Sequence, residues 1–227
     1  MARMAAAAGT TDIVASPHSN DEFRFDPSTV EAKIAELQAA VGESPVIHYG
    51  CDFHLNLENI QDALSSPAKY SIDHRGYLLV EFSDHLIPKT TTDIFAALIA
   101  SGMRPVITHP ERNPLLRERL ADLECWVCQG CLVQVTAQSL LGSFGRRAKA
   151  AADTMMHRGL VHVLASDAHD LKHRPPLLRP AYDHVTEHYG QEMAERLCVE
   201  NPQSILRGKP VEPGTSRAKS KRWCSLW

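Results

Sequence analysis

The apolar run Val161-His162-Val163-Leu164 leads directly into Ala165-Ser166-Asp167-Ala168-His169-Asp170. A buried strand that ends in Asp-x-His can direct two hard ligands at one divalent metal ion. A second strand end of this kind, Val106-Ile107-Thr108-His109-Pro110-Glu111-Arg112, lies upstream. Together the two stretches indicate a metal-dependent hydrolase.

Strand-like and helix-like segments alternate along the chain. Near-continuous apolar runs predict strands buried on both faces, at Thr11–Ser16, Val46–Gly50, Leu78–Phe82, Pro105–Thr108, Leu132–Thr136 and Val161–Ser166. Helical periodicity follows each run, at Pro27–Ala40, Leu57–Leu64, Thr92–Ser101, Leu116–Val127, Arg146–Arg158 and in several helices up to about Leu206. Repeated βα units favour a parallel sheet, arranged either as a barrel or as a doubly wound sheet.

The first of these helices has clear start signals. Asp26 is suited to the N-cap and Pro27 to the first helical position. Val30, Ile34, Leu37 and Val41 recur at helical spacing, which predicts one buried stripe.

Polar side chains with metal-binding chemistry occur at the ends of the predicted strands. In barrels and doubly wound sheets, functional residues gather at the carboxyl ends of the strands. A single histidine at such a position is more often a hydrogen-bonded core residue than a ligand. The prediction of one metal site therefore depends on six residues at equivalent places, which are His18, Asp52, Glu81, His109, Asp167 and His169.

Histidine and carboxylate ligands without cysteine suit Mn, Fe, Zn or Mg, and such a set can hold two or three ions. Clustered ions activate water and clamp both sides of a phosphoryl displacement. Arg112 and Arg174 follow His109 and His169 closely, so we expect their planar guanidinium groups to bind phosphate. His54 could replace or supplement Asp52, because residues two apart on an extended segment face the same side.

Composition narrows the function classes. The 227 residues carry a formal charge of −3, which gives no field favouring nucleic acid, and no apolar run is long enough for stable membrane insertion. Six cysteines without a signal peptide predict reduced thiols and a cytoplasmic protein. Cys125, Cys128 and Cys131 resemble half of a zinc or iron–sulfur framework, but free thiols at a helix–strand junction are favoured.

Other features are expected to lie outside the site. His48, His162 and His184 fall inside predicted elements and are interpreted as structural or exposed. The glycine-bearing Gly142–Arg147 stretch lacks P-loop spacing. Residues 1–208 are predicted to form one domain, and 209–227 a disordered basic tail. Its terminal Trp223–Trp227 could contact a partner or a membrane surface, although an unstructured end is favoured.

These motifs carry a resemblance to a known family. Thr11–His18, Leu78–Phe82, Thr108–Asn113 and Ser166–His169 resemble the bacterial PHP-type protein-tyrosine phosphatases, of the polymerase and histidinol phosphatase superfamily. Gln134–Leu140 and the Phe144-Gly145 pair fit the same pattern, and the similarity extends from about Gly9 to Gly208.

The resemblance implies a distorted (βα)₇ TIM-like barrel with a trinuclear metal site, often loaded with Mn²⁺. It implies removal of phosphate from bacterial tyrosine kinases that control capsule or exopolysaccharide synthesis. By position, six residues match metal ligands: His18, Asp52, Glu81, His109, Asp167 and His169. Arg112 and Arg174 match phosphate binders, and with Asp167 they are the expected catalytic residues.

The sequence departs from the family pattern at two places. Asp52 stands where many relatives have glutamate, which shortens the reach of a carboxylate that could bridge two ions. The family opens with a strand bearing His-x-His, which is not found here, so we expect about six strands, an open barrel edge beside Thr11–Ser16 and one metal with few ligands.

Three functions therefore stay open at this point. The favoured one is a metal-dependent protein-tyrosine phosphatase. The others are an inactive remnant that binds phosphotyrosine or a kinase, and a phosphatase of small phosphomonoesters such as histidinol phosphate. The sequence leaves the metal and the oligomeric state undecided.

Overall fold

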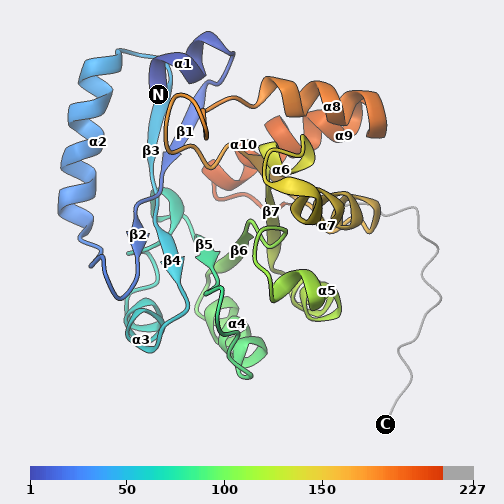
Figure 1. The fold of residues 1–227 in the computed structure, drawn as a ribbon. Coiled ribbons are helices and arrows are strands. Elements are labelled where there is room, and N and C mark those ends of the chain that lie inside the picture. The colour runs from blue at the N-terminus through green and yellow to red at the C-terminus, as the bar shows by residue number, and fades with distance from the viewer. Residues whose placement is uncertain (212–227) are drawn as a thin grey trace.

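A parallel sheet forms the centre of the fold (Figure 1). The computed structural model describes residues 1–211, and the remainder of the predicted tail, with Trp223 and Trp227, lies outside the described residues. The sheet has six strands, all parallel, in the order β2 (His18–Ser19), β4 (Asp52–His54), β5 (Tyr77–Glu81), β6 (Arg104–Thr108), β7 (Leu132–Thr136) and β8 (Val163–Ala165). A second, two-stranded ladder pairs β1 (Asp12–Ala15) with β3 (Val46–Tyr49), also in parallel.

The first two predicted strands are present as β1 and β3, and each is followed after a short break by a second strand, β2 or β4, that the sequence did not predict. Pro17 separates β1 from β2 and cannot donate a ladder hydrogen bond. Gly50 separates β3 from β4, and a Cβ at Gly50 would lie 2.5 Å from Cγ1 of Val14. The two breaks lie side by side, since the Asp52 N–H donates to the Pro17 carbonyl at 2.9 Å. As a result, His18 and Asp52 lie inside short strands rather than after them.

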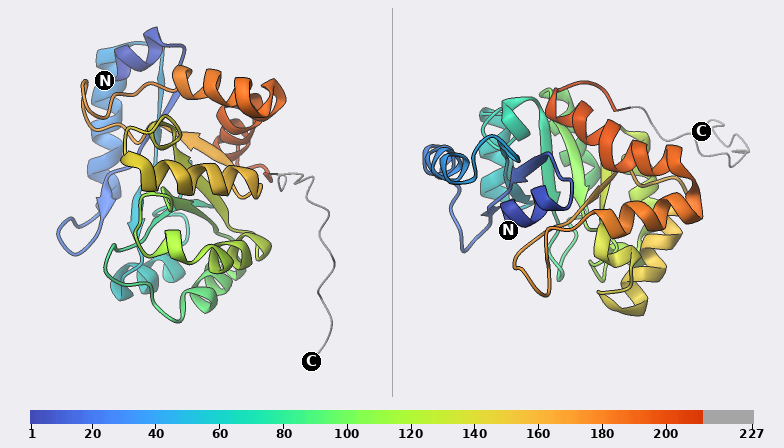
Figure 2. Two further views of the ribbon diagram at one scale, coloured as in Figure 1. Left: turned by 45° about the vertical axis from the view of Figure 1, so that its right-hand side comes forward. Right: turned by 90° about the horizontal axis from the view of Figure 1, so that it is seen from above.

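Helices cover the outside of the sheet (Figures 1 and 2). The α-helices are α1 (Ala2–Ala7), α2 (Pro27–Val41), α3 (Leu57–Ser65), α4 (Thr91–Ala100), α5 (Leu120–Cys128), α6 (Ala137–Leu140), α7 (Gly145–His157), α8 (Arg179–Tyr189), α9 (Gln191–Glu195) and α10 (Asn201–Leu206). This is the α/β architecture predicted from the sequence. Among the described residues no strand joins β8 to β2, so the barrel is distorted and not closed.

Three local predictions for the helices were wrong. The α2 helix is capped by Asp26 and begins with Pro27 as predicted, but none of its residues is buried, and Leu37 is 41% exposed. The helix expected over Leu116–Val127 is divided into a 3₁₀ turn (Leu116–Glu118) and α5. The loop expected after β7 begins with the short helix α6, whose residues are all buried.

Both faces of the central strands are buried. All five residues of β7 are buried, and Leu78, Val80 and Ile107 on β5 and β6 are fully inaccessible to solvent. Such burial explains the near-continuous apolar runs in the sequence. The core continues past Gly208, because Val211 is buried and the Tyr77 hydroxyl donates to the Lys209 carbonyl at 2.6 Å. None of the helices in residues 1–211 combines the length and hydropathy needed to cross a bilayer.

Two buried polar side chains fix the turn after β6. The Asn113 amide donates to the Ser83 carbonyl at 3.1 Å, which joins this turn to the end of β5. The Glu111 carboxylate is fully buried and accepts hydrogen bonds from the Thr136 N–H at 3.1 Å and the Ser139 hydroxyl at 2.6 Å. Burial raises the pKa of Glu111. The turn carrying His109 and Arg112 is therefore held from both neighbouring strands.

We expect Glu111→Ala to lower the free energy of unfolding by about 2–3 kcal/mol, because it leaves the Thr136 N–H and the Ser139 hydroxyl buried without an acceptor. Urea denaturation followed by circular dichroism measures the change. The exposed Glu118 provides the control, and Glu118→Ala should change stability by less than about 0.5 kcal/mol. Equal stability of the two variants would contradict this role for Glu111.

The burial of His162 should make the folded protein less stable at acidic pH. Its ring is buried and its Nδ1 accepts the Val133 N–H at 3.1 Å, so the folded state requires neutral imidazole. Burial lowers the pKa of His162 to about 4. The unfolded histidine takes up its proton near pH 6.5, so the stability contribution is complete above that pH and is lost as the pH falls towards 4.

Between pH 7 and pH 5, wild type should therefore lose about 1–2 kcal/mol more stability than His162→Gln, whose amide oxygen can still accept a hydrogen bond. Urea melts of both metal-free proteins at each pH provide the measurement. Parallel stability curves for the two proteins would show that His162 does not titrate as described.

Candidate metal centre

Strand register brings four of the candidate ligands onto one face. His18 on β2 is the register partner of Asp52 on β4, and His54 on β4 is the partner of Glu81 on β5. Residues opposite one another in a ladder point to the same face, as do residues two apart on one strand. His18, Asp52, His54 and Glu81 therefore lie on one face because of the backbone pairing alone.

The side chains converge on Glu81. The Nδ1 of His18 lies 3.1 Å from Oδ2 of Asp52 and 3.2 Å from Oε2 of Glu81. The Nε2 of His109 lies 3.3 Å from Oε1 of Glu81, and Nε2 of His54 contacts Oε2. Two groups with metal-ligand spacing result, one of His18, His54 and Glu81, the other of Asp52, Glu81 and His109. Glu81 belongs to both, so its two oxygens could serve two ions.

The ligand atoms of this cluster are arranged better for binding a divalent metal than for hydrogen bonding to one another. Four of these atoms are buried and have no well-aligned hydrogen-bond partner among the described residues: His18 Nδ1, Asp52 Oδ1, His54 Nε2 and Glu81 Oε2. They crowd together without proper hydrogen-bond geometry, which is costly unless a cation occupies the space between them. Imidazole nitrogen and carboxylate oxygen are also the donor types that Mn, Fe and Zn accept.

The electrostatics agree with a shared cluster. Burial would raise the pKa of Glu81, but the close contact with His54 and the charges of His109 and His54 outweigh it and lower the pKa to about 2. Burial raises the pKa of Asp52. The close contact with Asp52 raises the pKa of His18, and the charges of Asp52, Glu81 and Asp167 contribute. Glu81 is thus the carboxylate held most firmly in its ionised form.

Backbone strain marks the two motif turns. His109 after β6 has φ 34°, and Asp167 after β8 has φ 46°, in the left-handed region that non-glycine residues rarely adopt. Strain of this kind persists where the surroundings over-determine the backbone, and it is frequent at functional sites. It turns His109 towards Glu81.

Asp167 lies beside this cluster and contacts two arginines. Its Oδ2 accepts hydrogen bonds from Nη1 of Arg112 and Nη2 of Arg174. His169 lies closer to the protein surface than Asp167. Its side chain is 45% exposed, and its Nδ1 lies 3.8 Å from Oδ1 of Asp167. The structure therefore brings His18, Asp52, Glu81 and His109 together, and places Asp167 and His169 on the adjoining loop.

The sequence suggests His54 as a replacement for Asp52 or a supplement to it. In the structure His54 contacts Glu81 and belongs to one of the two ligand groups. The Asp-x-His spacing of Asp52 and His54 repeats that of Asp167 and His169, and this signal was available in the sequence. Glu111 lies within the His109 motif, and its role became clear only from its burial and its hydrogen bonds, which make it the anchor of the His109 turn.

Two histidines expected to lie outside the site, His48 and His162, and the cysteine cluster are not part of the ligand groups found in residues 1–211. His48 is held between Asp12 at 2.9 Å and Asp73 at 2.7 Å, and His162 is in the core. Cys125, Cys128 and Cys131 are free thiols, and no ligand group within residues 1–211 contains them.

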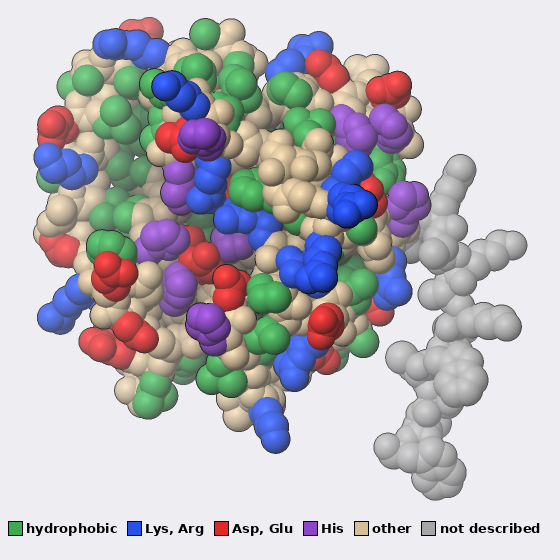
Figure 3. Space-filling model, in the orientation of Figure 1, with side chains coloured by type: hydrophobic (Ala, Val, Ile, Leu, Met, Phe, Trp, Pro, Cys, Tyr) green, Lys and Arg blue, Asp and Glu red, His purple; other side chains and the backbone are tan. Residues whose placement is uncertain are grey.

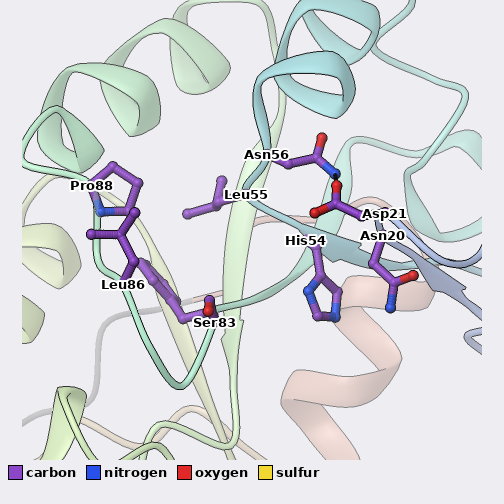
Figure 4. A pocket seen from close by; sticks show the side chains of 9 residues that line it. Asn20, Asp21, His54, Leu55, Asn56, Ser83, Leu86 and Pro88 are labelled. Carbon is purple, nitrogen blue, oxygen red and sulfur yellow. Dashed lines mark hydrogen bonds between the residues drawn. The ribbon is translucent and has the colours of Figure 1, made fainter.

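Cavities adjoin the ligand cluster on both sides of Phe82. One is lined by Glu81, His109 and Arg112, among others. The second lies beside His54, where Asn56 donates to Asp21 at 2.9 Å and Leu86 and Pro88 provide an apolar wall (Figure 4). In the space-filling view, histidine, acidic and basic side chains gather near the middle of one face (Figure 3). The site is thus open to a ligand from solvent.

Known proteins are similar to this chain over most of its length. Residues 1–207 match the family model for capsular polysaccharide synthesis, CpsB/CapC. The chain is 32% identical to the tyrosine-protein phosphatase YwqE of Bacillus subtilis (strain 168), over 93% of this chain and 84% of that protein. It is 28% identical to the tyrosine-protein phosphatase CpsB of Streptococcus pneumoniae, over 87% of this chain and 85% of that protein.

A solved structure has the same fold as this chain. It comes from the crystal structures of YwqE from Bacillus subtilis and CpsB from Streptococcus pneumoniae, which are described as unique metal-dependent tyrosine phosphatases. The fold superposes with a TM-score of 0.87 and 30% sequence identity, over 94% of this chain and 88% of that chain. With the family match over residues 1–207, these similarities show that this chain belongs to the CpsB/CapC family of capsular polysaccharide synthesis.

Proposed function

We propose that this chain is a metal-dependent protein-tyrosine phosphatase that transfers a phosphoryl group from phosphotyrosine to water. The observation that carries the proposal is the convergence of His18, His54, His109, Asp52 and Glu81 beside an arginine pair. The similar proteins YwqE and CpsB are tyrosine-protein phosphatases, which supports the same reaction here.

The proposed metal ligands are the two groups described above together with Asp167 and His169. Mn²⁺ is the ion that we propose, because mixed imidazole and carboxylate donors suit it. When bound, divalent ions at such a site polarise the phosphoryl group and activate water. Glu81 would serve both ligand groups, since it already offers one oxygen to each.

The arginines supply the phosphate-binding half of the site. Arg112 and Arg174 present guanidinium groups whose planar donors match phosphate oxygens. Asp167 holds both groups, and Nε of Arg174 is buried without an acceptor among the described residues. A phosphoryl oxygen would satisfy this donor. Two arginines against one carboxylate leave a net positive charge for the phosphate.

The natural substrate that we propose is a phosphotyrosine on a bacterial tyrosine kinase that controls capsule or exopolysaccharide synthesis. The family's association with capsular polysaccharide synthesis supports this choice. We also propose that the protein acts in the cytoplasm, since the five cysteines of the described residues are free thiols.

Phosphatase activity tests the proposal. Purified protein with added Mn²⁺ should hydrolyse p-nitrophenyl phosphate and a phosphotyrosine peptide. Asp167→Ala should abolish hydrolysis, and Arg174→Ala should lower kcat/KM by about 100-fold, because the transition-state charge loses a donor. Arg179, which is exposed and paired with Asp183, is the matched control, and Arg179→Ala should leave the rate unchanged. Equal rates for wild type and Asp167→Ala would sink the proposal.

Metal content provides an independent test. We expect two or more equivalents of Mn²⁺ per chain by elemental analysis after dialysis, with activity lost on treatment with EDTA and restored by Mn²⁺. His54→Ala and His109→Ala should each lower the equivalents bound. His184→Ala, in the His184–His188 pair on α8, is the control and should leave them unchanged. Less than one equivalent in the wild type would favour a non-catalytic binding protein instead.

A further inference from the structure

Phe144 lies beside the two arginines of the proposed phosphate site, and the proposed reaction gives its aromatic ring no role. It precedes α7 in the turn Gly142–Gly145, whose two glycines have φ of 86° and 84°. The turn is closed by hydrogen bonds from the Ser143 N–H to the Gln138 carbonyl and from the Gly145 N–H to the Gly142 carbonyl, both at 3.0 Å. Phe144 is half-buried and belongs to neither hydrophobic core cluster of the described residues. Core packing therefore does not account for it.

The ring faces both arginines of the proposed phosphate site. The Cζ of Arg112 lies 4.4 Å from the ring centroid and the Cζ of Arg174 lies 5.9 Å from it. Both distances are within the range of about 6 Å in which a guanidinium group is attracted to an aromatic face. One phenylalanine thus contacts two cations that come from different strand ends of the sheet.

The backbones of the two arginines are already fixed. The Arg112 N–H donates to the His109 carbonyl at 2.9 Å, and the Arg112 carbonyl accepts from Arg117 at 2.8 Å. Asp170 Oδ1 accepts the Arg174 N–H at 3.3 Å, and the Arg174 carbonyl accepts the His169 N–H at 3.0 Å. What these contacts do not fix is the orientation of the guanidinium groups.

Only Asp167 and Phe144 act on both guanidinium groups among residues 1–211. Asp167 is also a proposed metal ligand, so its carboxylate would be shared with a cation. The face of Phe144 has no such competing role, and it lowers the cost of holding two like charges close together.

We infer that Phe144 is a positioning residue that holds Arg112 and Arg174 with their donors directed at one phosphoryl group. This inference rests on the proposed function, since it assigns the arginines to phosphate. Phe144 acts through the arginines and takes no part in bond formation or cleavage.

The test compares Phe144→Leu, which removes the aromatic face at similar volume, with Phe144→Tyr, which keeps it. With Mn²⁺ and p-nitrophenyl phosphate, the leucine variant should lose about tenfold in kcat/KM, because two contacts that are each worth about two- to fivefold are removed. The tyrosine variant should retain most of the wild-type value. Leu141→Ala, beside the same turn and 40% exposed, controls for a general disturbance and should match wild type.

A double-mutant cycle separates positioning from a purely structural role. In an Arg112→Ala background, Phe144→Leu should cost clearly less than tenfold, because one of its two partners is already absent. If the leucine variant does not fold, Phe144→Met takes its place in every measurement. Full additivity of the two substitutions, or equal losses for the leucine and tyrosine variants, would overturn the inference.

Nitrogen-15 NMR of the arginine Nε–H groups gives a readout independent of activity. Ring currents from Phe144 should shift the signals of Arg112 and Arg174, assigned with the corresponding lysine variants, in wild type and in Phe144→Tyr but not in Phe144→Leu. If wild type fails to hydrolyse phosphotyrosine, the proposed function is wrong and this spectrum alone decides the placement of the arginines. If the arginine signals of Phe144→Leu equal those of wild type, the ring does not lie against the two guanidinium groups and the inference is wrong.

Discussion

The carboxylate of Glu81 is the group on which the candidate site depends. Oε2 contacts His18 and His54, and Oε1 contacts His109, so one side chain collects imidazoles from two other strands and from the turn after a third. Such crowding of a partly buried carboxylate with three imidazoles needs a cation between them or protons on the rings. The parallel ladder makes the arrangement unavoidable, because register sets His54 opposite Glu81 and His18 opposite Asp52.

Buried residues around this cluster hold the ligand-bearing turns in place and are not themselves candidate ligands. Glu111 and Asn113 tie the His109 turn to the strands on either side of it, and both are buried. Left-handed backbone at His109 and Asp167 is held in place by these surroundings. The arginines receive similar support from Asp167 and Phe144. A site of this design keeps its geometry before any ligand arrives, which is what electrostatic catalysis requires.

The sequence predicted those elements whose apolar pattern is compatible with only one secondary structure. The alternation of apolar runs and helical periodicity predicted the positions of β5, β6, β7 and β8 and of most helices, since burial on both faces demands such runs. The sequence did not predict β2 and β4, which follow β1 and β3 after the breaks at Pro17 and Gly50, because the close contact of Gly50 with Val14 is not written in either segment. It also overestimated the burial of α2, whose apolar stripe is only half covered.

For the site, the chain alone supplied the ligand types and their places at strand ends, because His-x-Glu-Arg and Asp-x-His motifs follow recognisable strands. It did not rank His54 among the ligands, nor show that Asp167 turns towards two arginines or that Phe144 faces both of them. These relations join residues that are up to 55 positions apart, Arg112 and Asp167 being the widest pair. Only strand register and side-chain packing fix such distances, and neither is a property of a single segment.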